Sequence, residues 1–256
     1  MPEPIRGIFP LTPAASKRLI ARAVAALPEV QRARREGRIV IANGITNAFV
    51  AEEMLGRPVP KYNYAAGYVG HGQLSETAAE ERLSPYVLLR GEPVDVPAKE
   101  FIKEFEAGDV FIKGGNAIDP QGHVGILMGD DRGGTIGMAL GTVTARGAHL
   151  IMPVGLEKMV PSVIEAARMC GINRLSYALG KRVGLMPVTT GRAITEIQAL
   201  ALLCGVTATH VASGGIGGCE GSVVLVVEGS AEQVRRAFEL VEAIKDEPSV
   251  PAHSQR

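Results

Sequence analysis

The chain has 256 residues, of which 46% are hydrophobic, enough for one large core or for a principal domain with a smaller companion. Lys plus Arg number 27, as do Asp plus Glu, so the chain has neither the basic field that attracts nucleic acid nor an acidic tail. The three cysteines, Cys170, Cys204 and Cys219, are widely spaced and form no CxxC pair, which excludes a disulfide framework and a thiolate zinc site.

The apolar runs are short. The longest, such as residues 222–227, end well below the roughly 20 residues that a membrane span requires. The first ten residues, MPEPIRGIFP, lack the basic-then-apolar order of a signal peptide. We therefore expect a cytoplasmic protein with neither nucleic acid nor a membrane as a partner.

The first elements along the chain are helices. Thr12 followed by Pro13 is a helix start, and apolar residues at helical spacing up to Leu27 predict a first helix, after which Pro28 opens a second, Arg-rich one. Residues 38–42 then predict a buried strand, 43–46 a turn and 47–55 a helix. The stretch 61–77 has neither periodicity, so we expect an irregular loop.

The middle of the chain alternates between strands and helices. The predicted strands are residues 86–90, 109–113, 124–128 and 149–152, and the predicted helices are residues 97–107, 133–144 and 162–169. Such alternation is typical of an α/β fold in which these strands share one mostly parallel sheet with helices on both faces.

After residue 175 the order of elements changes. We predict a strand at 183–188, a helix at 193–204, strands at 208–212 and 221–227, and a helix at 231–245. This β-α-β-β-α order is that of a ferredoxin-like α+β unit, and such units often pair, so we expect a homo-oligomer. The expected domains are an α/β ligand-binding domain at 1–174, a ferredoxin-like domain at 175–247 and a disordered tail at 248–256.

Three glycine turns carry chemistry that suits a ligand. Gly44-Ile45-Thr46-Asn47 and Gly133-Gly134-Thr135 each place backbone N–H groups and a hydroxyl at a helix start, which favours an anion. Lys113-Gly114-Gly115-Asn116 adds a cation and an amide at a strand end, and Arg132 precedes the last turn as a possible bidentate donor. The alternative is that these residues only cap helices and turn the chain. Neither a dinucleotide-binding GxGxxG nor a P-loop is present.

A family resemblance rests on three stretches. Residues 114–119, GGNAID, with Gly122 and Val124 resemble the superfamily of sugar-phosphate isomerases and CoA transferases (NagB/RpiA/CoA transferase-like), which includes the LUD domain proteins of lactate utilisation. Residues 44–48, GITNA, with Glu52 and Glu53 resemble the first glycine turn and helix of the LUD proteins, and residues 149–161, HLIMPVGLEKMVP, resemble the strand and G-x-E-K-I-V-P stretch after their ligand loops.

The resemblance covers roughly residues 10–170. It implies a three-layer α/β/α fold whose turns hold a phosphorylated or CoA-like ligand, with CoA as a substrate rather than a resident cofactor. The acidic pair of the isomerases and the S-E-N-G nucleophile motif of the CoA transferases are absent, and Asp119 alone matches the acidic position. Residues 190–191 and 221–229 bear a weaker likeness to the shell-forming BMC domain, which we take as topology only.

Several side chains are candidates for chemistry. Asp119 suits a general base and Lys113 a group that polarises a carbonyl or holds a phosphate, although an Asp-Pro turn and a surface lysine are the alternative. His71, between two glycines, suits a ligand contact or proton transfer. The glycine stretch 214–221 is either a flexible hairpin or a lid that brings Glu220 or Cys219 to the main pocket, where Glu220 would suit acyl transfer. No metal-ligand spacing stands out.

Two functions remain open from the sequence. The first is an enzyme that acts on an anionic small metabolite, either an isomerase or an acyl/CoA transferase-like enzyme. The second is a non-catalytic ligand sensor or assembly protein in which the same pocket binds an effector.

Overall fold

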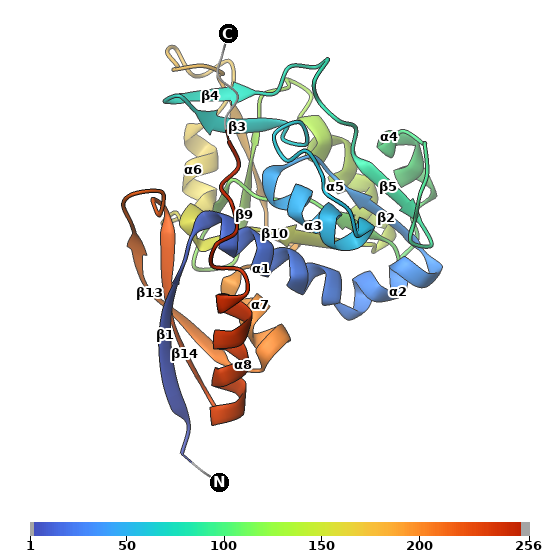
Figure 1. Cartoon of the computed structure of the whole chain (residues 1–256). Coiled ribbons are helices and arrows are strands. Elements are labelled where there is room, and N and C mark those ends of the chain that lie inside the picture. The colour runs from blue at the N-terminus through green and yellow to red at the C-terminus, as the bar shows by residue number, and fades with distance from the viewer. Residues whose placement is uncertain (1–2, 252–256) are drawn as a thin grey trace.

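A six-stranded sheet lies at the centre of the protein (Figure 1). The computed structural model describes residues 3–251. The sheet has the strand order β12-β10-β7-β2-β5-β6, and its first four strands pair in parallel. The bounds are β2 (Arg38–Ile41), β5 (Tyr86–Leu89), β6 (Glu92–Pro93), β7 (Val110–Ile112), β10 (His149–Pro153) and β12 (Arg192–Ile194). Strand β5 runs antiparallel to β2, and the edge strand β6 runs antiparallel to β5.

Helices cover both faces of this sheet, and the chain is an α/β protein as predicted. Alternate residues of β2 point to opposite sides: Ile39 and Ile41 belong to one buried cluster, whereas Val40 belongs to the other. The first cluster is covered by α1 (Pro13–Ala26), α2 (Pro28–Glu36) and α3 (Ile45–Leu55). The second is covered by α4 (Ala98–Phe101), the 3₁₀ turn η1 (Ile102–Glu104) and α5 (Gly134–Arg146).

The predicted helix start at Thr12 is confirmed. The Thr12 hydroxyl accepts a hydrogen bond from the Ala15 N–H at 3.2 Å, and Pro13 occupies the first turn of α1, where its missing N–H is not needed. Helix α1 ends at Ala26 because Pro28 begins α2 two residues later.

The prediction that residues 124–128 share the mostly parallel sheet is wrong. Strand β9 (Val124–Met128) pairs antiparallel with β8 (Ala117–Ile118) and with β11 (Gly184–Val188) in a separate three-stranded sheet. The reason is the short connection at residues 119–123, which reverses the chain directly after β8, whereas a parallel neighbour needs a crossover of a dozen or more residues. Helix α6 (Val163–Met169) packs against β9 and β11.

The expected ferredoxin-like sheet is not formed. Its predicted strand at 183–188 is β11, which pairs with β9, while β12 joins the central sheet. Strands β13 (Thr207–Gly214) and β14 (Ser222–Gly229) instead take the N-terminal β1 (Ile5–Leu11) as their third strand. Helices α7 (Glu196–Cys204) and α8 (Ala231–Glu242) lie close to their predicted positions.

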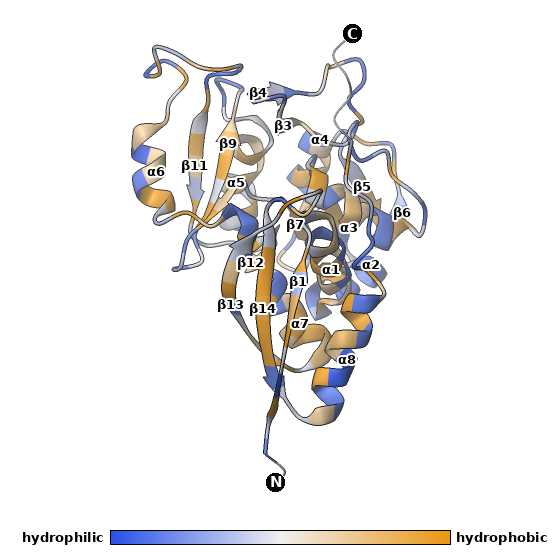
Figure 2. Cartoon of the chain, turned by 60° about the vertical axis from the view of Figure 1, so that its left-hand side comes forward, coloured by the Kyte–Doolittle hydropathy of each residue, from blue (hydrophilic) through white to orange (hydrophobic). Residues whose placement is uncertain are grey.

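Packing crosses the predicted domain boundary at 174/175, which itself stays a prediction. One buried cluster runs from the central sheet through α1 and α7 to the sheet of β1, β14 and β13. In Figure 2 β14 is largely hydrophobic, whereas α8 shows both colours, as an amphipathic helix lying against this sheet should. Of the predicted tail, Val250 packs against the core, and residues 252–256 lie outside the described residues.

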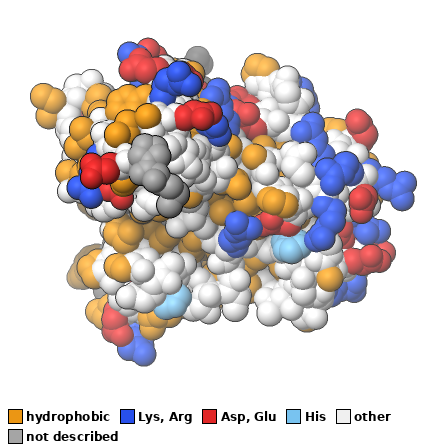
Figure 3. Space-filling view, turned by 90° about the horizontal axis from the view of Figure 1, so that it is seen from below, with side chains coloured by type: hydrophobic (Ala, Val, Ile, Leu, Met, Phe, Trp, Pro, Cys, Tyr) orange, Lys and Arg blue, Asp and Glu red, His pale blue; other side chains and the backbone are white. Residues whose placement is uncertain are grey.

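The predicted loop at 61–77 contains a hairpin, formed by β3 (Gly67–Gly70) and β4 (Gln73–Glu76). Among residues 3–251, no helix combines the length and the apolar character needed to cross a membrane. On the face seen from below, Lys and Arg side chains lie among Asp and Glu, without a field of one sign (Figure 3).

Candidate functional site

The carboxyl ends of the four parallel strands meet at one edge of the central sheet. Residues 42–47 follow β2, residues 113–115 follow β7, residues 154–158 follow β10, and residues 195–196 follow β12. In open α/β sheets this edge is where the connections after the strands converge and where ligands bind. The functional candidates are therefore the polar side chains of these four segments.

The first two glycine turns lie against each other. The Asn47 amide, at the start of α3, donates to the carbonyl of Ala42 at 2.6 Å and to that of Ile112 at 3.3 Å, and so ties the ends of β2 and β7 together. Gly114 faces this side chain, because a Cβ there would lie 3.4 Å from Asn47 Oδ1. Oδ1 is buried and has no hydrogen-bond partner among the described residues. Gly44, at φ 155°, supplies the backbone conformation that starts α3.

Five charged residues gather at this edge, and we call them the charge cluster: Lys17, Lys113, Glu157, Lys158 and Glu196. Lys17 comes from α1, and its Nζ lies 3.2 Å from Glu157 Oε1. The Lys158 Nζ donates to the Gly115 carbonyl at 3.1 Å and lies 3.9 Å from Glu157 Oε1. Glu196, fully buried at the start of α7, accepts from the Leu156 N–H at 2.9 Å.

Lys113 is the member of the cluster without an acidic partner. Its Nζ donates to the Asn43 carbonyl at 3.4 Å, and no carboxylate of the described residues lies within 4.0 Å of it. Burial, together with the nearby Lys158 ammonium, lowers the pKa of Lys113 to about 8. The cluster therefore contains an amine that is partly neutral near physiological pH.

The pKa values of the two glutamates of the cluster shift in opposite directions. Burial and the neighbouring Glu157 carboxylate raise the pKa of Glu196 to about 7, against hydrogen bonds from backbone N–H groups and Ser16 that favour its ionised form. Burial also acts to raise the pKa of Glu157, but Lys158 and Lys17 outweigh it, so that this pKa is lowered. The site thus holds one carboxylate and one carboxyl group that titrates near neutrality, an arrangement suited to acid–base work.

Gly155 leaves room for the Glu157 carboxylate, with which a Cβ at this position would collide. At Gly115 a Cβ would collide with Val124, so glycine there is required by close packing between the segments after β7 and at β9.

A cavity of about 450 Å³ lies beside the charge cluster and shares Lys17 with it. Its walls come from the start of α1, the start of α3, the 214–221 loop and the segment that follows α8. The residues that line the cavity include Pro13, Lys17, Ile45, Gly218, Glu220, Lys245, Asp246, Glu247 and Val250. The glycine loop thus reaches a cavity next to the cluster and brings the exposed Glu220 to it.

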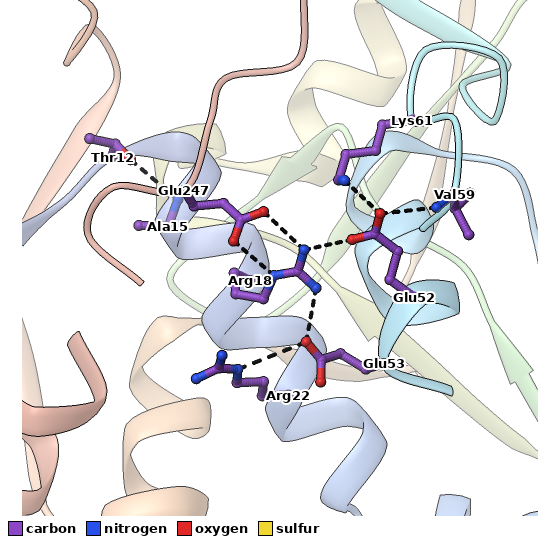
Figure 4. Close-up of polar contacts among 9 residues, drawn as sticks. All are labelled: Thr12, Ala15, Arg18, Arg22, Glu52, Glu53, Val59, Lys61 and Glu247. Atoms are coloured by element: carbon purple, nitrogen blue, oxygen red, sulfur yellow. Dashed lines mark hydrogen bonds and ion pairs between the residues drawn. The ribbon is translucent and has the colours of Figure 1, made fainter. Parts of the chain in front are cut away.

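The segment after α8 is fastened across α1 by Arg18 (Figure 4). Glu247 accepts from Arg18 through both oxygens, at 3.0 Å from Nε and 2.9 Å from Nη2. Arg18 also donates to Glu52 and Glu53 of α3, and Glu52 accepts from Lys61 at 2.7 Å. These contacts hold residues 245–250 in place as one wall of the cavity.

Asp119, the predicted general base, is occupied structurally. Oδ1 of its buried carboxylate accepts from the N–H groups of Gln121 and His123, and Oδ2 accepts from the Val163 N–H and lies 3.1 Å from His123 Nδ1. These contacts hold the β8–β9 turn against the start of α6. The pKa of Asp119 is lowered, since backbone and His123 hydrogen bonds outweigh the effect of burial.

Among the other predicted residues, Arg132 and Asn116 contact groups outside the cluster. Arg132 is exposed beside Asp130 and Asp131, and Gly133, Gly134 and Thr135 begin α5 without a side-chain cap. Asn116 accepts from the Leu127 N–H, and His71 lies exposed at the tip of the β3–β4 hairpin. Of the candidate residues, the structure brings together Gly44, Asn47, Lys113, Gly114 and Gly115, with Thr46 buried beside them.

Four members of the cluster were missed as functional candidates: Lys17, Glu157, Lys158 and Glu196. Glu157 and Lys158 lie in the GLEKMVP stretch, which was recognised only as a resemblance. Lys17 and Glu196 lie on amphipathic helices, where a charged residue ordinarily faces solvent. Their only sequence signal was a charge close to a helix start, which by itself is equally typical of capping.

Residues 3–251 contain no group of three or more His, Cys, Asp or Glu side chains arranged to hold a metal ion. Comparison with known proteins adds no relative: no family model, no curated protein and no solved structure matches this chain.

Proposed function

We propose that the protein binds an anionic small metabolite, of the sugar-phosphate or CoA type, at the charge cluster, and that it acts on this metabolite as an isomerase or acyl/CoA transferase-like enzyme. The observation that carries the proposal is the imbalance of charge. Three ammonium groups face at most two carboxylates, and one of the three, Lys113, has no acidic partner within 4.0 Å. Because a buried charge without a counter-charge is unfavourable, a bound anion would complete the site.

The position of the cluster supports the same proposal. The start of α3 lies beside Lys113 and Gly114, and backbone N–H groups at a helix start favour an anion. We further propose that the sheet with helices on both faces is the three-layer α/β/α fold that the family resemblance implies. In that fold the strand-end turns are the place for a phosphorylated or CoA-like ligand.

The acid–base groups support catalysis. Isomerisation next to a carbonyl needs one group that removes a proton and one that donates a proton. In the cluster, Lys113 in its neutral form suits the base and Glu196 in its protonated form suits the acid. Lys113 and Glu196 thus take the acid–base role that the sequence suggested for Asp119, because the oxygens of Asp119 accept hydrogen bonds within the β8–β9 turn and from the start of α6.

One observation favours the non-catalytic alternative. Asp119 is the only residue that matches the acidic position of the resembling enzymes, and its carboxylate holds backbone N–H groups instead of facing the cluster. A ligand sensor that uses the same anion site requires no such base. Turnover separates the two functions.

The first prediction concerns ligand-induced stabilisation. At low ionic strength, saturating phosphate, ribose 5-phosphate or acetyl-CoA should raise the melting temperature of the protein by about 5 °C for at least one of these anions. Lys158→Met should abolish the rise, because it removes one of the ammonium groups, whereas Lys99→Met, an exposed residue of α4, should retain it.

Each melting temperature is compared with that of the same variant without ligand. An equal rise in both variants, or none in the wild-type protein, would contradict the proposed site. Any anion that stabilises the protein is then tested for conversion. Turnover supports the enzyme, and binding without turnover supports the sensor.

A further inference from the structure

We infer that Lys113 is a nucleophilic amine that forms an imine with the carbonyl carbon of an anionic aldehyde or ketone, while Lys158 and Lys17 hold the carboxylate or phosphate of that compound. This inference rests on the proposed function and deepens it, because it names both the class of substrate and the bond that forms. In it the neutral Lys113 amine attacks the carbonyl carbon instead of removing a proton.

The surroundings of Lys113 favour this role. The residue follows β7 directly, so a buried strand fixes the start of its side chain. Its Nζ has one hydrogen-bond partner, the Asn43 carbonyl at 3.4 Å, which accepts a proton but offers no counter-charge. The residue keeps partial exposure. The nitrogen is therefore held at the strand-end edge without the acidic partner that would keep it protonated.

The neighbouring lysines are placed for a different task. Lys17 pairs with Glu157 at 3.2 Å, and Lys158 bonds the Gly115 carbonyl and lies 3.9 Å from the same carboxylate. Burial lowers the pKa of Lys158, although attraction to Glu157 and Glu196 opposes this effect. Lys17 and Lys158 each have an acidic partner within 4.0 Å and Lys113 has none among the described residues, so the three amines divide into two anion holders and one nucleophile.

The protonation of Lys113 agrees with this division. Burial and the Lys158 ammonium lower the pKa of Lys113 to about 8, so an appreciable fraction is neutral near neutral pH. A neutral lysine amine in a desolvated site next to another cation is a known way to activate this nucleophile.

The Lys113 nitrogen forms a bond to the carbonyl carbon while the carbonyl π bond breaks, and the oxygen takes a proton from the Glu196 carboxyl group, the acid of the proposed function, so that Lys158 keeps its charge. The nitrogen passes one of its protons back to the Glu196 carboxylate, which leaves a neutral carbinolamine. The Glu196 carboxyl group then protonates the hydroxyl, which leaves as water while the nitrogen lone pair forms the C=N bond, and the nitrogen returns a proton to Glu196 to leave the imine. The sum is one amine and one carbonyl compound giving one imine and one water, without an oxidant or a reductant.

The test uses glyoxylate, an anionic aldehyde, and glycolaldehyde, a neutral one of similar size. The wild-type protein is treated at about pH 7.5 with either probe and with cyanoborohydride, which delivers hydride to the imine carbon and fixes a stable secondary amine. Mass spectrometry of the peptides then measures the rate at Lys113 and, in the same sample, at the exposed Lys99. Because both lysines are read in one folded protein, no variant needs to fold.

The expected result is that glyoxylate modifies Lys113 about tenfold faster than Lys99 at about pH 7.5, and that the rate at Lys113 levels off above about pH 8. Inorganic phosphate should slow the reaction of glyoxylate at Lys113 only. Equal rates at the two lysines would overturn the inference.

The outcomes also separate the inference from the proposed function. If phosphate stabilises the protein but Lys113 reacts no faster than Lys99, the anion site stands and the imine fails. If Lys113 reacts rapidly but equally with glyoxylate and glycolaldehyde, and phosphate neither protects it nor stabilises the protein, the anion site fails and the inferred substrate class fails with it.

Discussion

At the scale of single residues, the site contains side chains whose charges or hydrogen-bonding groups are not satisfied by their surroundings. Lys113 is a cation without an acidic partner, Glu196 is a fully buried carboxyl group, and Asn47 Oδ1 is buried without a hydrogen bond among the described residues. Groups of this kind reduce stability and are retained where a ligand or a reaction uses them. Arg18 is the contrast: burial acts to lower its pKa, but hydrogen bonds to Glu247, Glu52 and Glu53 outweigh burial and raise it.

The prediction at this scale is that Lys113→Met stabilises the protein without ligand. Because the pKa of Lys113 falls from 10.5 in the unfolded chain to about 8 in the folded protein, the charged amine destabilises the fold at pH values below 8. The gain should be about 2 kcal/mol at pH 7, allowing for the partial exposure of the residue. Urea unfolding measures it, Lys99→Met should change stability by less than about 0.5 kcal/mol, and a loss on Lys113→Met would show that the ammonium supports the fold.

At the scale of elements, the unexpected feature is the segment after α8. It crosses α1 toward the β3–β4 hairpin and forms one wall of the cavity (Figure 1). Its anchor is the two-oxygen contact between Glu247 and Arg18, a geometry that gives an ion pair more strength and direction than a single contact does. Since Arg18 also bonds Glu52 and Glu53, the segment is joined to α3 as well as to α1.

The prediction at this scale is that Glu247→Gln loosens the segment while the rest of the fold stays intact. The neutral amide keeps the size of the side chain but loses the charge that pairs with Arg18, which is worth on the order of 1 kcal/mol at a partly buried site. Amide hydrogen exchange at residues 245–251 should accelerate about fivefold. Glu53→Gln is the matched control, because it removes another carboxylate from Arg18 and should leave exchange in this segment unchanged. Equal acceleration in both variants would contradict the prediction, because it would show that the loss of any carboxylate partner of Arg18 loosens the segment.

At the scale of the whole molecule, elements from the first and the last parts of the sequence form one sheet. The N-terminal β1 pairs with β14, and α8 packs on the same sheet, with Phe238 against Phe9 and close to Gly7. The buried cluster continues from here through α1 and α7 to the central sheet. The free energy of global unfolding therefore depends on buried groups that lie between the central sheet and the sheet of β1, β14 and β13. Glu196, at the start of α7, is one of these groups.

The prediction at this scale concerns pH. The pKa of Glu196 rises from 4.5 in the unfolded chain to about 7 in the folded protein, so the stability linked to its proton is fully present below about pH 4.5 and is lost as the pH rises through 7. Glu196→Gln does not titrate. Its stability relative to the wild-type protein should therefore increase between pH 4.5 and 8, by about 2 to 3 kcal/mol.

Urea unfolding of both proteins across this pH range measures the difference, in which titrations common to both proteins cancel. Glu239→Gln, on the exposed side of α8, is the control and should give a difference independent of pH. A constant difference for Glu196→Gln as well would mean that Glu196 titrates normally in the folded protein.

Local patterns in the sequence determined most of the elements. Thr12-Pro13 and Gly205 mark real helix ends, and the short apolar runs at 38–41, 110–112 and 149–153 are three of the four parallel strands of the central sheet. The fourth, β12 at 192–194, was predicted as the start of a helix. These signals are readable because caps, turns and the hydrophobic period act over a few residues. Of the three glycine turns, the first two lie against each other at the strand-end edge.

Only the tertiary structure decided which strands pair and which charges meet. A strand at 184–188 has the same apolar pattern whether it pairs with β9 or with β13, and nothing local shows that β1 completes the sheet of β14. Likewise, Lys17, Lys158 and Glu196 lie far apart in the sequence and acquire their meaning from burial next to one another, because desolvation and Coulomb interactions depend on distance in space. The sequence by itself determined most of the elements, and the fold decided which side chains lie together at the strand-end edge.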